Sequence, residues 1–199
     1  MKEASQTKTT RDAILDATDR LLAHYGYKKM TIDDLAREVG IGKGSVYLHF
    51  TSKEEIALSH IDRIIERLKQ SLRSIAEMSK PVDERLREML VERVLFRFDS
   101  VQHYSQSLND LLLSLRSQLL ERRKRHFDEE ALIFARVITE GQVSSVLAEG
   151  DAFGLAETLV TATNSLLPYS LSAFELGDRS DLAERVGKTA DLLIRGLAR

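Results

Sequence analysis

Apolar side chains recur along almost the whole chain at the three- and four-residue spacing of an amphipathic helix. No stretch alternates apolar and polar residues as a half-buried strand would. We therefore expect an all-α fold, in which Gly26 and Pro81 end helices, a polar break spans 99–106 and Pro168 kinks a helix. The longer helices are predicted over about 10–25, 53–78, 82–98, 108–139 (dividing near 114–118), 151–176 and 181–197.

Two shorter helices lie between Thr31 and Phe50 and are joined by a glycine turn. Thr31 can cap the first through its hydroxyl, and Gly40 can adopt the left-handed conformation that ends it. A short helix, a glycine turn and a second short helix are typical of a helix-turn-helix, whose second helix enters the DNA major groove. The apolar faces of the two helices hold Ile32, Leu35, Ala36 and Val39, and then Ile41, Val46 and Phe50.

The outer face of the second short helix carries side chains suited to DNA. Lysine and tyrosine bind phosphates, serine reaches a phosphate or a base edge, and Gly44 lets the backbone come close to a partner. Lys53 lies in the first turn of the next helix, where the helix dipole disfavours a cation unless an anion lies nearby. We expect Ser45 and His49 to face base edges. The candidate DNA-binding residues are Thr31, Lys43, Gly44, Ser45, Tyr47, His49 and Lys53.

Residues 10–60 closely resemble the DNA-binding domain of the TetR family of bacterial transcriptional repressors. Gly42 departs from the family pattern, which usually has serine, threonine or alanine there, but glycine still serves as an N-cap. The resemblance implies a three-helix head over 1–52 and a helical ligand-binding and dimerisation domain over 53–199. It rests on Tyr25-Gly26-Tyr27, Thr31-Ile32, Leu35-Ala36, Gly40-Ile41, Lys43-Gly44-Ser45-Val46-Tyr47, Phe50 and Lys53-Glu54-Glu55.

The resemblance also implies a homodimer, because in the family the last two helices pair with those of a second subunit as a four-helix bundle. The last predicted helix has a broad apolar stripe that suits such an interface. On the pattern alone, the stripe fits equally well a helix that covers the subunit's own core. The candidate interface residues are Leu182, Val186, Leu193, Ile194 and Leu197.

The C-terminal domain is expected to enclose an apolar pocket bounded by the helices that begin at Val82, Leu108 and Asp151, since ligand pockets often lie between helices. Few charges fall on these faces, so a neutral or amphipathic organic ligand is expected. Arg97 is a candidate partner for a carboxylate, although a surface position is favoured for it. The candidate ligand-binding residues are Phe96, His103, Phe127, Phe134, Asn164 and Tyr169, with ordinary core packing as the alternative for the aromatic ones.

Composition narrows the remaining classes of function. The chain has 199 residues and no cysteine, which excludes disulfides and a cysteine nucleophile and suits the cytoplasm. No signal peptide, membrane span, nucleophile–base set or cofactor motif is recognised, and the five histidines lack metal-ligand spacing, so neither an enzyme, a cofactor nor a metal site is expected. The net charge of −2 does not itself indicate a nucleic-acid partner; the lysines around the helix-turn-helix do.

These observations favour a homodimeric transcriptional repressor that binds a palindromic double-stranded operator and is released by a small molecule. The alternative is a DNA-binding scaffold or activator that is regulated by a partner protein and has no small-molecule ligand. A tightly filled C-terminal domain would favour that alternative.

Overall fold

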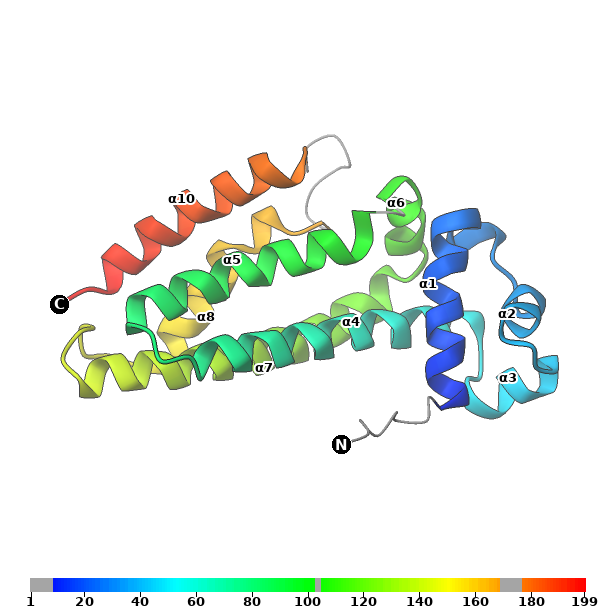
Figure 1. Cartoon of the computed structure of the whole chain (residues 1–199), viewed down its shortest axis with the longest axis horizontal. Helices are drawn as coiled ribbons and strands as arrows, with labels where there is room; N and C mark the ends of the chain where they lie inside the picture. The colour runs from blue at the N-terminus through cyan, green and yellow to red at the C-terminus, as the bar shows by residue number, and fades with distance from the viewer. Residues whose placement is uncertain (1–8, 103–104, 169–176) are drawn as a thin grey trace, which may run out of the picture.

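The structure is a computed structural model that describes residues 9–102, 105–168 and 177–199 (Figure 1). The expected all-α fold is confirmed: within these ranges the only strand-like pairing is an isolated bridge between Leu147 and Ala198. None of the described helices is long and apolar enough to cross a membrane. The helices are α1 (Thr10–Lys29), α2 (Ile32–Val39), α3 (Lys43–His49), α4 (Lys53–Ala76), α5 (Val82–Val101), α6 (Ser105–Ser114), α7 (Arg116–Val143), α8 (Ala152–Ala162) and α10 (Arg179–Leu197).

Helices α1, α2 and α3 form a head at one end of the molecule (Figure 1). The hydroxyl of Thr31 accepts a hydrogen bond from the Asp34 amide at 3.1 Å, and the Asp34 carboxylate accepts one from the Thr31 amide at 3.2 Å. This reciprocal capping box starts α2. Gly40 ends the helix at φ +77°, a conformation that glycine adopts at little cost. The helix-turn-helix thus forms where the local signals predict it.

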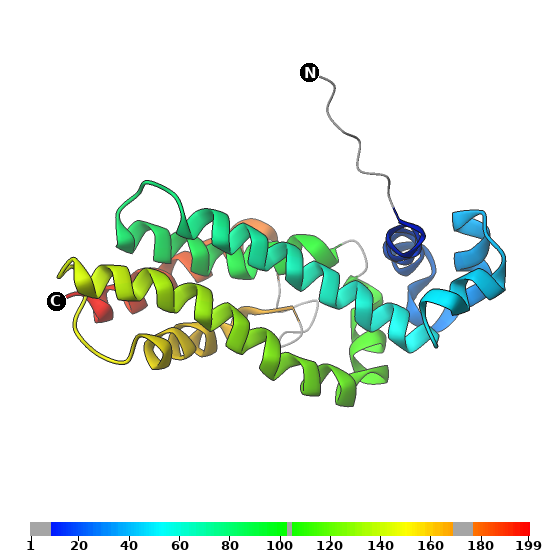
Figure 2. The same cartoon turned by 90° about the horizontal axis from the view of Figure 1, so that it is seen from below.

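The long α4 leads from the head into a bundle with α5 and α7, while α8 packs on α7 and α10 packs on α5 (Figures 1 and 2). Leu115 separates α6 from α7, within the range where the pattern predicts a division. Gly141 lies inside α7 rather than in the turn that follows it. A Cβ there would come within 2.6 Å of the Leu147 side chain, so glycine permits close packing of the loop after α7.

The polar break expected over 99–106 is wrong at both of its ends. Helix α5 continues through Val101, and α6 begins at Ser105. Within α5, the Ser100 hydroxyl donates to the Phe96 carbonyl at 2.7 Å, and Asp99 pairs with Arg179 of α10 at 2.8 Å. Polar side chains that find such partners do not end a helix.

Pro168 does not kink a helix, contrary to the sequence-based prediction. Helix α8 ends at Ala162, and a short 3₁₀ turn over Asn164–Leu166 follows it. Leu167 is extended, with φ −87° and ψ 148°. The proline ring disfavours a helical conformation in the residue before it, which accounts for the extended Leu167. Because α8 has already ended at Ala162, there is no helix at Pro168 to kink.

A buried ionic trio joins α5, α7 and the turn after α8. The Nε of Arg93 donates to Glu130 at 2.7 Å, and the Nη2 of Arg97 donates to the same carboxylate at 2.5 Å. Arg93 also donates to the Thr163 hydroxyl and the Asn164 side-chain oxygen, each at 2.7 Å. Burial alone would raise the pKa of Glu130, but the charges and hydrogen bonds of Arg97 and Arg93 lower it below the usual 4.5.

Replacement of Glu130 by glutamine should destabilise the fold by about 3–5 kcal/mol, because it leaves two buried guanidinium groups without a countercharge. Denaturant unfolding at pH 7 measures the loss. Since the pKa of Glu130 is lowered in the folded state, its ionic stabilisation is complete above the usual 4.5. It disappears as the pH falls through the folded-state pKa, so the difference between the wild type and the variant should shrink below about pH 4.

The matched control is Glu184→Gln on α10. Glu184 pairs with Lys188, and both side chains are mostly exposed. Its loss should leave the unfolding free energy nearly unchanged, because solvent screens an exposed ion pair. Equal effects of the two substitutions would contradict a structural role for the buried trio.

Candidate DNA-binding surface and ligand cavity

The recognition helix α3 has a buried inner face and an exposed outer face. Val46 and Phe50 pack into the head core, whereas Lys43, Tyr47 and His49 are exposed and Ser45 is half-buried. A Cβ at Gly44 would have nothing within 4 Å, so packing inside the subunit does not require glycine there. The outer face is therefore open to a partner as a DNA-reading surface must be, and the individual contacts remain predictions.

Two of the candidate phosphate ligands have partners within the head. The Nζ of Lys43 donates to Asp33 at 2.8 Å, and this hydrogen bond raises the pKa of Lys43. The hydroxyl of Thr31 donates to Asp34 at 2.6 Å while it caps α2. A phosphate bound by Lys43 would have to compete with Asp33.

Lys53 has a structural role that the sequence reasoning missed. Its Nζ donates to the carbonyls of Tyr27 and Met30 at 3.1 and 3.2 Å and lies 4.5 Å from the centre of the Tyr27 ring. These carbonyls at the end of α1 account for a cation in the first turn of α4 without any DNA. Burial and the neighbouring Glu54 raise the pKa of Tyr27 to about 12, so its hydroxyl stays protonated. A phosphate contact from Lys53 stays a prediction.

Leu48 is a further candidate for DNA recognition that the sequence reasoning missed. Its side chain is 85% exposed near the C-terminal end of α3, between Tyr47 and His49. The sequence feature that could have identified it is an apolar side chain on the otherwise polar face of the recognition helix. Such side chains contact the methyl group of thymine in the major groove.

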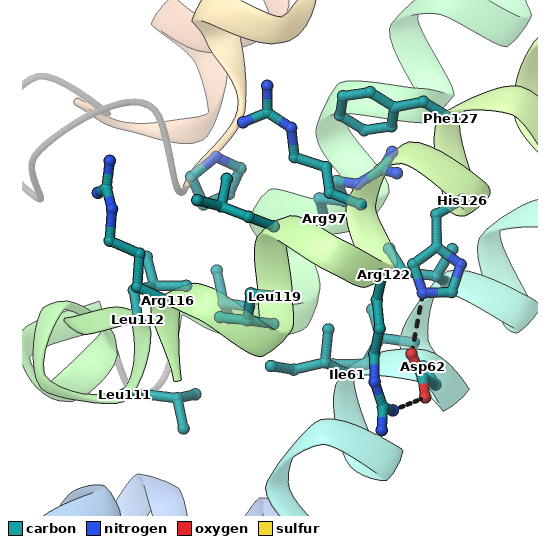
Figure 3. Close-up of a pocket in the computed structure, with 16 residues that line it drawn as sticks. Ile61, Asp62, Arg97, Leu111, Leu112, Arg116, Leu119, Arg122, His126 and Phe127 are labelled. Atoms are coloured by element: carbon teal, nitrogen blue, oxygen red, sulfur yellow. Dashed lines mark hydrogen bonds and ion pairs between the residues drawn. The ribbon is translucent and has the colours of Figure 1, made fainter. Parts of the chain in front are cut away.

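A cavity of about 270 Å³ lies between α4, α5, α6 and α7 (Figure 3). Ile61 and Ile65 of α4, Leu111 and Leu112 of α6 and Leu119 of α7 supply much of its apolar wall. The volume is close to the lower end of the roughly 300–1,000 Å³ typical of small-molecule sites. The C-terminal domain thus contains a cavity, but α4 lines it and α8 does not, and its use by a ligand stays a prediction.

Only part of the predicted ligand-binding set reaches this cavity. Phe127 lines it, whereas Phe134 is fully buried in the core, and Phe96 packs against the same core cluster. Asn164 accepts its hydrogen bond from Arg93 and does not line the wall. His103 and Tyr169 lie outside the described residues.

The cavity wall is more charged than the sequence predicts. Arg97 is buried and lines the cavity, so the expectation that it lies on the surface is wrong. Arg122 and His126 of α7 both converge on Asp62 of α4 (Figure 3), with 2.9 Å between His126 Nε2 and the carboxylate. Burial alone would raise the pKa of Asp62, but its hydrogen bond with His126 and the charge of Arg122 lower it. The spacing of apolar residues could not reveal this charged cluster, because its members come from α4, α5 and α7 and meet only in the fold.

Helix α6 belongs to both the cavity and the head. Leu111 lines the cavity and is also buried in the core cluster of the head, together with Leu115. Lys28 of α1 pairs with Asp110 of α6 at 2.7 Å. A change in the cavity that moves α6 would therefore act directly on the head.

The apolar stripe of α10 faces mainly inward. Leu182 and Val186 are fully buried against α5 in the subunit's own core, so their assignment to a dimer interface is wrong. Leu193, Ile194 and Leu197 are partly buried against the neighbouring core cluster and remain candidates. Leu192 is 73% exposed and is the large apolar side chain that α10 leaves on its outer face.

The comparisons agree with this geometry. A family model described as bacterial regulatory proteins, tetR family, matches residues 14–59. An uncharacterized helix-turn-helix transcriptional regulator from Haemophilus influenzae is 32% identical over 42% of this chain and 46% of its own length, so the chain spans about half the length of this relative. The fatty acid metabolism regulator protein of Bacillus subtilis is 24% identical over 92% of this chain and 93% of its own length.

The whole fold is also shared with solved structures. A TetR-family transcriptional regulator from Pectobacterium atrosepticum aligns with a TM-score of 0.75 at 19% identity, covering 95% of this chain and 94% of that one. The relatives are transcriptional regulators rather than enzymes. Residues 14–59 therefore match the helix-turn-helix DNA-binding domain of the tetR family of bacterial regulatory proteins, and the whole chain has the fold of a TetR-family transcriptional regulator.

Proposed function

We propose that the protein is a homodimeric, sequence-specific transcriptional repressor that a small amphipathic ligand releases from a palindromic operator. The observation that carries this proposal is the shared use of α6, because Leu111 belongs both to the cavity wall and to the core of the DNA-binding head. We further propose a division into a head over 1–52 and a ligand-binding and dimerisation domain over 53–199, and action in the cytoplasm.

The mechanism is a shift between two populations. A dimer binds both half-sites only when its two recognition helices are about 34–36 Å apart, one DNA turn, or a multiple of that distance. A ligand weakens DNA binding only by the difference in its affinity for the DNA-binding and released conformations. The contacts of α6 with α1 supply a route by which filling the cavity favours one head orientation.

The cavity supports a small-molecule effector over a partner protein as the regulator, because a filled C-terminal domain would leave no place for a ligand. The likeness to the fatty acid metabolism regulator of Bacillus subtilis makes acyl compounds the first class to test. The dimer is supported by the likeness to the TetR family and by the exposed Leu192 of α10.

Lys43→Ala should weaken binding to every DNA sequence and reduce the slope of log affinity against log salt by about one, since a phosphate contact releases one counterion. Tyr47→Phe should weaken binding without unfolding the head. The operator is first selected from random DNA with the wild-type protein, and affinity is then measured by fluorescence anisotropy across a salt series. Lys124→Ala on α7, which removes another exposed, ion-paired lysine, is the control. Wild-type affinity in both head variants would refute the assigned contacts.

Leu48 should read a thymine methyl group. Replacing thymine by uracil, one position at a time in each half-site, removes that methyl group and should cost about 0.8 kcal/mol, or roughly fourfold in affinity, at the contacted base. Leu48→Ala should be insensitive to the same replacement. Leu113→Ala on α6, another strongly exposed leucine, should retain the wild-type response. Uracil sensitivity that is the same in all three proteins would rule out the methyl contact.

Leu192→Arg should raise the dimer dissociation constant at least tenfold, because it would place an unpaired charge in the apolar interface of both subunits. Sedimentation velocity measures the change, and operator affinity should fall with it. Leu132→Arg alters an exposed leucine on α7 and should leave the dimer intact. An unchanged dimer in the Leu192 variant would place the interface elsewhere.

A further inference from the structure

Arginines dominate the charged part of the cavity wall. Arg97, Arg116, Arg122 and Arg123 line it, and Asp62 is the only carboxylate among its described lining residues. Such a wall repels cations and attracts anions, and it does so more strongly than an open surface because the surrounding protein has a low dielectric constant.

The buried arginine in this wall is incompletely neutralised. Arg97 shares the single charge of Glu130 with Arg93, so the trio carries one excess positive charge within the core. The Nη1 of Arg97 donates to the Arg93 carbonyl at 2.9 Å, while its Nε is buried and has no hydrogen-bond partner in the part of the chain that the structure describes. A guanidinium with an unused donor is suited to a carboxylate or a phosphate.

The carboxylates near the wall are already bonded. Asp62 accepts hydrogen bonds from Arg122 and His126, and Glu129 accepts one from Lys69. Neither carboxylate thus brings an additional negative charge to Arg97. Arg116 and Arg123 are both exposed, and the guanidinium carbon of Arg123 lies 5.3 Å from the centre of the Phe127 ring.

We infer that the cavity selects an apolar molecule with an anionic head group, a carboxylate or a phosphate monoester. Arg97 anchors the head group, Arg116 and Arg123 attract it, and the leucine and isoleucine wall holds the apolar part. A neutral ligand would leave the positive charge at Arg97 without a countercharge, and a cationic one would add to it. This inference rests on the proposed function, in which the cavity receives the effector, and it narrows the expected neutral or amphipathic ligand to an anionic amphipathic one.

The test compares molecules with one apolar chain and different head groups. Isothermal titration calorimetry with decanoate, decyl phosphate, decanol and decylamine, each below its micelle concentration, should give at least tenfold tighter binding of the anions than of decanol. This ratio corresponds to one charge-assisted hydrogen bond. Decylamine should not bind measurably. Added salt should weaken the binding of the two anions but not the binding of decanol. A tenfold preference between the two anions would identify the head group as carboxylate or phosphate.

Variants test the residues. Arg97→Gln should weaken decanoate binding about tenfold and leave decanol unchanged. Because Arg97 belongs to the buried trio, the exposed pair Arg116→Gln with Arg123→Gln provides an independent variant, in which decanoate binding and its salt dependence should both fall. Arg136→Gln, an exposed arginine on α7 outside the cavity wall, is the matched control and should bind like the wild type.

The outcomes separate this inference from the proposed function. If the protein binds decanoate and decanol with equal affinity and either compound releases the DNA, the preference for anions is overturned. The proposed function, a repressor released by a ligand, would then still stand. Failure of every probe to bind a protein that still binds its operator would overturn both the selectivity and the small-molecule part of the proposed function.

Discussion

The packing of α6 between the head and the cavity is the interaction on which the regulatory account depends. Leu111 and Leu115 are buried among side chains of α1 and α4, so α6 completes the core of the DNA-binding head. Leu111 also lines the cavity, together with Leu112 of the same helix. A ligand that displaces α6 by a fraction of a turn must therefore either repack the head core or carry the head with it, since close-packed interiors do not deform continuously.

The second attachment of the head is α4. Ile56, Ala57 and Leu58 belong to the head core, and Lys53 binds the carbonyls at the end of α1. Further along α4, Arg63 donates to Asp16 of α1 at 2.7 Å. The head is thus tied to the first turns of α4, and Ile61 and Ile65, which follow on the same helix, line the cavity. Both attachments of the head lead to the same cavity.

Local sequence signals predicted the head well and the cavity poorly. Thr31 and Gly40 mark the ends of α2 through bonds that each makes with residues no more than five positions away, so sequence alone suffices for them. The burial of Arg97 depends on Glu130, which is 33 positions away. The inward orientation of Leu182 and Val186 depends on α5, which periodicity cannot identify as a partner, because a helix presents the same stripe to its own core and to a second subunit. The prediction of a kink at Pro168 is wrong because α8 already ends at Ala162, and Leu167, the residue before the proline, is extended.

The coupling between ligand binding in the cavity and operator binding by the head is tested most directly by its reciprocity. The dissociation constant of decanoate is measured by calorimetry on the free protein and on the protein saturated with its selected operator. If the two sites are coupled, operator DNA must weaken decanoate binding by the same factor by which saturating decanoate weakens operator binding, typically about 5–150-fold. Decanoate that binds the free and the operator-bound protein with equal affinity would contradict the account.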